Sequence, residues 1–287
     1  MKEKIVKYIL VSAASTSIII VFLIFLFLIK EAVPFIEDPG MSHLFKSKWN
    51  PVSFFNESFG LLPLITGSLL VTFMATIIAV PFGVIAAVYI SEIAGSRERE
   101  TLKPFIELLA GLPSVVLGFF GLIVLSPIIK ELFHLDSGLS ALTGAVILAM
   151  MAVPTIISVS EDAIRGVPLA YKQASMALGA TKLQTIWRVI VPASLSGIIA
   201  AIMLGIGRVI GETMAVLMVT GNAPLVTLNP YESVRTMTAT IAGEMGEVPF
   251  GSAHYSALFW VGIVLLLMTF CLVVISQKVL KKYSFEA

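Results

Sequence analysis

Six stretches of this chain are apolar enough to cross a lipid bilayer as helices, which takes about 20 mainly apolar residues each. They are residues 5–29, 64–90, 104–129, 140–160, 193–221 and 255–280. The first starts with basic residues, as a signal peptide does, but its apolar part runs for about 25 residues without an A-x-A-like site, so we expect a retained span. The predicted fold class is all-α, a polytopic membrane protein with six transmembrane helices.

The charged residues are few, and their placement argues against a soluble role. They make up 13% of the 287 residues, whereas soluble domains carry about 25%. The net charge is +1, and the charges lie in short clusters between apolar runs. Because no single basic face results, we expect no nucleic-acid partner, and membrane lipid is the expected surrounding.

Sequence motifs for metal binding and catalysis are missing. The single cysteine, Cys271, lies in an apolar run, and His43, His134 and His254 are scattered without ligand spacing. There is no GxxxxGK[ST] loop for ATP and no HExxH. We therefore expect no catalytic residue, no metal and no cofactor.

The loops differ in their content of lysine and arginine, which favour the cytoplasmic side of a membrane. The two termini and the loops after the second and fourth spans carry 13 of these residues, and the remaining loops carry five. Both termini are therefore predicted to be cytoplasmic.

Loop lengths divide the chain into three parts. Residues 1–63 hold the first span and an extracytoplasmic segment rich in Pro, Phe and Trp, which we expect to be ordered. Residues 64–280 hold the other five spans and the longest cytoplasmic connection, 161–192, and residues 281–287 form a cytoplasmic tail. No internal repeat is evident, which disfavours an inverted-repeat secondary transporter.

The cytoplasmic connection 161–192 carries the most specific spacing in the sequence. It reads Gln173-Ala174-Ser175, three residues, Gly179, nine residues, and then Val-Ile-Val-Pro192. This resembles the EAA loop of ABC-importer permeases, except that Gln173 replaces the glutamate of that pattern. The resemblance implies that a short helix here docks in a cleft of a cytoplasmic ATPase.

The side chains of this segment agree with such a role. The small residues allow another backbone to approach closely, and Leu178 and its apolar neighbours suit a groove. The alternative is an amphipathic helix lying on the membrane surface.

Two charges interrupt the fifth apolar stretch, in the segment GIGRVIGETMA. If 193–221 is one helix, Arg208 lies near its midpoint and Glu212 one turn later, on the same face. A charge at mid-membrane costs about 2.5 kcal/mol or more, and such residues usually face a cavity or a partner. Arg208 is suited to bind an oxyanion with its planar fork, and Glu212 can hold that fork in place and weaken the attraction enough for release. The alternative is an ion pair that fixes helix packing, helped by the Gly207-x-x-x-Gly211 spacing.

Other polar positions have ordinary explanations. Glu92 and Glu107 lie near the cytoplasmic ends of spans, where solvated or interfacial carboxylates are common, and Glu161 is expected to solvate the following loop or to cap its helix. Gly111-Leu112-Pro113-Ser114 either bends a helix or opens a helix N-terminus toward an anion.

Two further stretches narrow the family. GLPSVVLGFFGL at 111–122 and GRVIGETMAV at 207–216 resemble the phosphate-specific transport permeases, and the loop around Trp49 with FGLLPLITGSL resembles their PstC-type subunit. The resemblance implies a type I (MetI-like) ABC-importer permease fold with the first span peripheral to a five-helix core. It also implies a PstA-type permease partner, a PstB-type ATPase dimer and an extracytoplasmic phosphate-binding protein.

The expected function is thus a permease subunit for inorganic phosphate, with Arg208 and Glu212 on the substrate pathway. The residues expected to couple the permease to the ATPase are Gln173, Ala174, Ser175, Gly179 and Pro192. Alternatives are a permease for molybdate or sulfate and a passive anion channel, which would not require the docking loop. An intramembrane hydrolase would need a second acid or a nucleophile beside Glu212, and none is evident.

Overall fold

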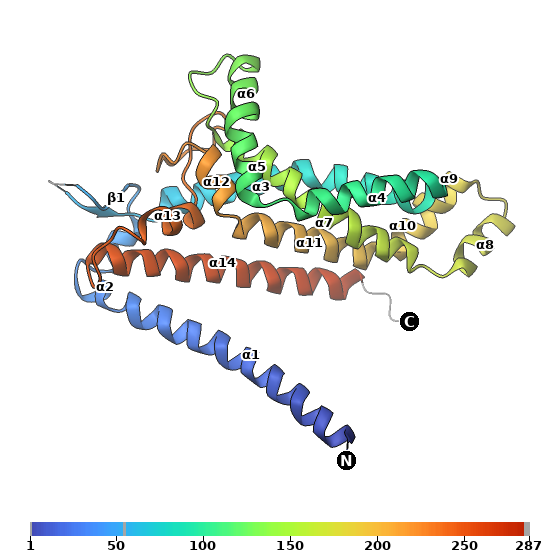
Figure 1. Ribbon diagram of the computed structural model, residues 1–287, viewed down its shortest axis with the longest axis horizontal. Coiled ribbons are helices and arrows are strands. Elements are labelled where there is room, and N and C mark those ends of the chain that lie inside the picture. Colours follow the sequence, from blue (N-terminus) through green and yellow to red (C-terminus); the bar gives the residue numbers. More distant parts are fainter. Residues whose placement is uncertain (1, 54–55, 284–287) are drawn as a thin grey trace.

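The computed structural model describes residues 2–53 and 56–283, and nearly all of its regular structure is helical (Figure 1). Within these residues five helices are long and apolar enough to cross a membrane, and a sixth span results if two helices joined at a 68° bend are taken as one. The expected all-α fold is confirmed, with six spans on that reading. Residues 284–287 of the predicted tail lie outside the described part.

The first helix, α1 (Lys2–Ala32), contacts the last one, α14 (Ala253–Tyr283), near its own C-terminal end. There the rings of Phe27 and Phe259 meet edge to face at 5.5 Å, and Trp260 donates a hydrogen bond to the Ala32 carbonyl. Figure 1 shows α1 diverging from the other helices toward its N-terminus. Most of its apolar side chains are exposed, as expected for a helix that faces lipid.

The centre of the molecule is formed by α3 (Leu62–Val88), α7 (Ala141–Arg165) and α11 (Leu195–Gly211). Ile156 of α7 lies against a glycine on each neighbour: a Cβ built on Gly83 of α3 would lie 2.6 Å from Ile156, and one on Gly205 of α11 would lie 2.7 Å from it. Small residues permit this close approach of helices. The glycines thus set how α3 and α11 pack on α7.

The third apolar stretch was predicted as a span over 104–129 with a bend or a helix start at Gly111 to Ser114, and in the structure the span starts there. An amphipathic helix, α4 (Ser96–Gly111), ends before Pro113, and the span comprises α5 (Ser114–Phe120), the π-helical turn η3 (Gly121–Leu125) and α6 (Ser126–Leu132). Proline disfavours helical geometry in the residue before it, and Leu112 is accordingly extended, with φ −65° and ψ 132°.

The fifth stretch, predicted as one helix over 193–221, is broken on both sides of α11. Before it, α9 (Lys182–Thr185), the π-helical turn η4 (Ile186–Ile190) and α10 (Val191–Ala193) run at 68° to α11. After it, Glu212 and Thr213 leave helical geometry, and the short helix α12 (Met214–Val219) follows.

One end of the molecule is a small folded cap. It contains α2 (Pro34–Glu37), the 3-10 turn η1 (Met41–Phe45), the antiparallel strands β1 (Trp49–Asn50) and β2 (Ser58–Phe59), and α13 (Met237–Glu244). Trp49 pairs with Phe59 in the strand register, and both side chains are buried in a cluster with Phe35 and Leu44. The described part of the loop between the first two spans is thus ordered, as expected.

The opposite end carries α8 (Leu169–Ala177) and the π-helical turn η2 (Tyr89–Ile93), which continues α3. Figure 1 shows the N-terminus and the end of α14 toward this same end, far from β1 and α13. A chain that crosses a membrane an even number of times has both termini on the same side, so this arrangement agrees with six spans.

Candidate functional site

The break after α11 decides where the two charges of the fifth stretch lie. Arg208 is in the last turn of α11, which ends at Gly211, and Glu212 follows with extended backbone, φ −70° and ψ 136°. The two residues therefore do not share one helix face, which corrects the prediction from their spacing. Among the described residues, no ion pair joins them.

Arg208 instead contacts α7. Its Nη1 donates a hydrogen bond of 3.3 Å to the hydroxyl of Thr155, and its side chain is half-buried. Thr155 follows Pro154, which is buried inside α7 and supplies no N–H to the helix. Sequence reasoning missed Thr155, because a threonine inside an apolar span is common and its partner is 53 residues away.

Glu212 serves the local backbone. Its carboxylate accepts a hydrogen bond of 3.2 Å from the N–H of Ala215 in the first turn of α12, and its carbonyl accepts one of 2.8 Å from Thr238 of α13. A carboxylate here caps a helix start. The predicted role of Glu212 in holding the arginine fork is not seen; Thr155 takes that position.

The packing alternative rested on Gly207 and Gly211. A Cβ built on either glycine would meet no atom within 4 Å, and both residues are exposed. Within the described chain this glycine face is therefore not a helix contact. It lies open beside Arg208, on the same helix end.

The predicted coupling residues lie at the other end of the molecule, on and around α8. Gln173 and Ala174 of α8 are exposed, as are Gly179 and Pro192, whereas the hydroxyl of Ser175 lies 2.9 Å from that of Thr185 at the end of α9. Gly179 has φ +86°, a left-handed conformation that glycine adopts readily and that ends the helix. Leu178 is 90% exposed. The structure does not bring these residues near Arg208.

A cavity of about 680 Å³ lies beside α8. Its lining includes Tyr171 and Arg188 together with Pro192, Ser194 and Gly197. The 68° bend between α10 and α11 therefore forms part of the wall of this cavity.

Three carboxylates expected to be solvated or interfacial differ from one another. Glu161 is only 2% exposed and pairs with Lys103 of α4 at 3.3 Å and with Arg165 at 3.2 Å. Glu92 is 7% exposed and pairs with Lys172 of α8 at 2.5 Å. Glu107 is exposed, as expected. Sequence analysis missed the three ion pairs of these two buried carboxylates, because Lys103 and Lys172 lie on other elements and Arg165 lies one turn away in a stretch expected to be solvated.

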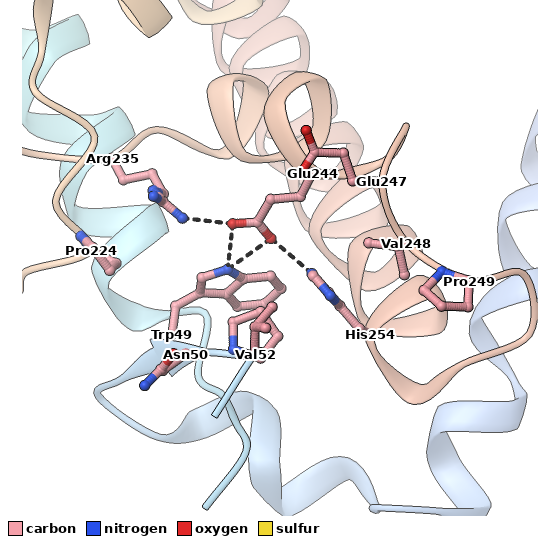
Figure 2. Close-up of a pocket in the computed structure, with 11 residues that line it drawn as sticks. Trp49, Asn50, Val52, Pro224, Arg235, Glu244, Glu247, Val248, Pro249 and His254 are labelled. Carbon is pink, nitrogen blue, oxygen red and sulfur yellow. Dashed lines mark hydrogen bonds and ion pairs between the residues drawn. The ribbon is translucent and has the colours of Figure 1, made fainter. Parts of the chain in front are cut away.

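A second polar cluster lies in the cap, around Glu244 at the end of α13 (Figure 2). The carboxylate accepts hydrogen bonds from Trp49 Nε1 at 3.1 Å and Arg235 Nη1 at 2.6 Å, and lies 2.8 Å from His254 Nε2. These residues line a pocket of about 480 Å³. No group of three metal-ligating side chains occurs in the described residues.

Comparison with known proteins places the chain among transport components. Residues 79–283 match the family described as "Binding-protein-dependent transport system inner membrane component". The chain is 40% identical to a probable ABC transporter permease of Bacillus subtilis, YqgH, over 79% of this chain and 73% of that protein. It is 34% identical to the phosphate transport system permease protein PstC of Mesorhizobium japonicum, over 85% of this chain and 79% of that protein.

The fold has a solved counterpart. A bacterial ABC transporter involved in the import of the acidic polysaccharide alginate aligns with a TM-score of 0.64, over 96% of each chain. The sequence identity is 16%, so this likeness concerns the fold alone.

Proposed function

Because the chain belongs to the family of binding-protein-dependent transport system inner membrane components, we propose that it is the PstC-type permease subunit of an ATP-driven importer of inorganic phosphate. Its fold is that of the type I ABC-importer permeases, as expected. The observation that carries the choice of substrate is the 34% identity to a phosphate permease over 85% of this chain.

The proposed partners follow from that assignment. They are a PstA-type permease, a PstB-type ATPase dimer and an extracytoplasmic phosphate-binding protein. One of the solved counterparts is an alginate transporter in complex with its substrate-bound periplasmic protein, which supports an assembly of this general kind.

We propose that both termini and α8 lie in the cytoplasm, and that the cap around Trp49 lies outside. Two observations support this orientation. The N-terminal end of α1 and the C-terminal end of α14 lie toward the same end of the molecule as α8 (Figure 1). That end also carries most of the lysine and arginine residues of the loops, which favour the cytoplasmic side.

Arg208 is the proposed anion-attracting group of the pathway. One of its nitrogen atoms is occupied by the neutral hydroxyl of Thr155, so that interaction leaves its positive charge uncompensated. The open faces of Gly207 and Gly211 beside it leave room for an approaching anion. Broken helices line the substrate sites of many transporters, and α11 and α12 form such a break. Glu212, the first residue of the break, supplies a negative charge that favours release.

The proposed coupling surface is α8 with its flanking residues. Its buried contacts are few, and its apolar side chains are exposed, with Leu178 the most exposed of them. A short helix with this exposure is suited to enter a groove on an ATPase.

Reconstitution tests the proposal directly. The full complex with its ATPase and binding protein is placed in proteoliposomes, and uptake of phosphate, sulfate and molybdate is measured side by side with and without ATP. We expect ATP-dependent uptake of phosphate and at least about tenfold less of the other two anions. Uptake of sulfate or molybdate in preference to phosphate contradicts the substrate, and uptake that continues without ATP contradicts the importer and indicates a channel.

A further inference from the structure

Polar side-chain contacts hold α8 to the rest of the chain. None of its residues is buried, and several of its apolar side chains face outward. Its side-chain attachments are polar: Lys172 to Glu92, and Ser175 to Thr185. These two residues of α8 are three positions apart, and therefore lie on one side of the helix. The attachment of α8 to the rest of the chain therefore depends on these polar contacts more than on apolar burial.

The contact between Lys172 and Glu92 is the stronger of the two. Lys172 Nζ lies 2.5 Å from Glu92 Oε1, and the exposed fractions of the two side chains are 24% and 7%. Charges shielded from water attract each other more strongly than surface charges do. Removing one partner leaves the other charge buried without compensation, which is more damaging than loss of a surface pair. The pair joins segments 80 residues apart in sequence.

Glu92 belongs to a turn that is itself firmly held. It lies in η2, the π-helical continuation of α3, and Arg99 of α4 donates hydrogen bonds of 2.9 Å to the carbonyls of Ile90 and Ser91. π-helical turns are rare and occur often at functional sites. These hydrogen bonds tie the backbone just before Glu92 to α4, and η2 itself continues α3 without a break.

A series of contacts leads from α3 through α7 to Arg208 in α11. Gly83 of α3 packs against Ile156 of α7, and the adjacent Thr155 of α7 binds Arg208. The second attachment of α8, through Ser175 and Thr185, leads to η4 and so to the start of α11. The start of α11 is therefore linked to α8 through Thr185 and η4. Its end, at Arg208, is linked to α8 through Glu92, α3 and α7.

We propose that Glu92 and Lys172 form the ion pair that passes displacement of α8 to α3, and that both are positioning residues for coupling ATP hydrolysis to transport. The proposal rests on the proposed function, in which α8 docks on the ATPase. Neither residue contacts the substrate. Their role is to keep α3 and α8 moving as one body through the transport cycle.

The test uses the complete transporter in proteoliposomes, and measures phosphate uptake and ATP hydrolysis in the same sample. Glu92→Gln is expected to lower the number of phosphate ions taken up per ATP about tenfold, the size of a typical coupling between sites. The ATPase is expected to copurify with this variant, because Glu92 lies in η2 and not on the proposed docking surface of α8. The charge-exchanged double variant, Glu92→Lys with Lys172→Glu, is expected to return the ratio to within about threefold of wild type.

Glu161→Gln is the matched control, because it also removes a buried carboxylate at this end of the molecule but does not touch α8. It is expected to lower thermal stability and to leave the uptake per ATP unchanged. An unchanged ratio in Glu92→Gln, or a double variant that couples no better than Glu92→Gln, overturns the proposal. A wild-type complex that binds no ATPase overturns the proposed function instead.

A cross-link gives a second test, in which a covalent link replaces the ion pair between Glu92 and Lys172. Glu92→Cys and Lys172→Cys are combined with Cys271→Ser, and the two thiols are joined by a short bismaleimide. If α3 and α8 move as one body, the cross-linked complex keeps ATP-dependent uptake. Abolished uptake on cross-linking shows that the two segments must separate, and it overturns the proposal.

Discussion

At the scale of single residues, Arg208 carries the strongest prediction about transport. Its guanidinium lies in an apolar span and is held by one hydroxyl, that of Thr155. A hydrogen bond from Arg208 to a phosphate anion would contribute about 1.5–3 kcal/mol, as hydrogen bonds to charged groups do. Arg208→Gln is therefore expected to lower ATP-dependent phosphate uptake by about 10- to 100-fold. Thr155→Val removes only the positioning contact and is expected to lower uptake by less.

The measurement is uptake at equal amounts of assembled complex in the membrane. Arg97→Gln is a suitable control, because Arg97 is exposed on α4, away from the helix break and outside α8. Wild-type uptake in Arg208→Gln would remove Arg208 from the pathway and leave its hydrogen bond to Thr155 as a packing contact between α11 and α7.

Glu244 carries a prediction about stability. Its carboxylate joins the first outer loop, the segment before α13 and the start of α14, through Trp49, Arg235 and His254 (Figure 2). Glu244→Ala leaves three donors without their common acceptor and is expected to destabilise the cap by about 2 kcal/mol. The apparent melting temperature in detergent should fall by several degrees. Glu247→Ala, in the same pocket but exposed, should leave it unchanged.

At the scale of elements, the glycine contacts decide how the helices pack. Gly83→Ala places a methyl group against Ile156 where no space exists, since the built Cβ lies 2.6 Å from Cγ2 and 2.9 Å from Cβ of that side chain. Overpacking of this kind costs about 1–3 kcal/mol. Thermal unfolding of the purified protein should show the loss.

Gly207→Ala is the matched control for that prediction, because its Cβ meets nothing within 4 Å. Alanine has the higher helix propensity, by up to about 1 kcal/mol, so this variant should be as stable as wild type or slightly more stable. Equal melting temperatures for the two variants would mean that α3 and α7 separate easily.

At the scale of the whole molecule, the ends of the chain and the cap are predicted to lie on opposite sides of the membrane. In a Cys271→Ser background, Phe250→Cys is expected to react with a membrane-impermeant maleimide added to intact cells, because Phe250 is 85% exposed in the loop after α13. Lys4→Cys should react only after the cells are opened. Labelling of Lys4→Cys in intact cells would reverse the orientation.

Several features followed from the sequence by itself because they depend on local composition. Apolar length predicted the spans, and the resemblance of the segment from Gln173 to Pro192 to the EAA loop implied a short helix there. The cost of a charge in lipid singled out Arg208 without any tertiary information. Pro113 marked a break or bend, although the sequence left open which it was.

Only the tertiary structure decided which residues meet. Arg208 and Glu212 are four positions apart, yet the helix ends between them, because the Glu212 carboxylate caps α12 and its carbonyl is bound by Thr238 of α13. Thr155, Lys172 and Trp49 reach their partners across 53, 80 and 195 residues. Such pairings depend on how α3, α7 and α11 pack, and the packing is determined by contacts between distant segments that no local pattern encodes.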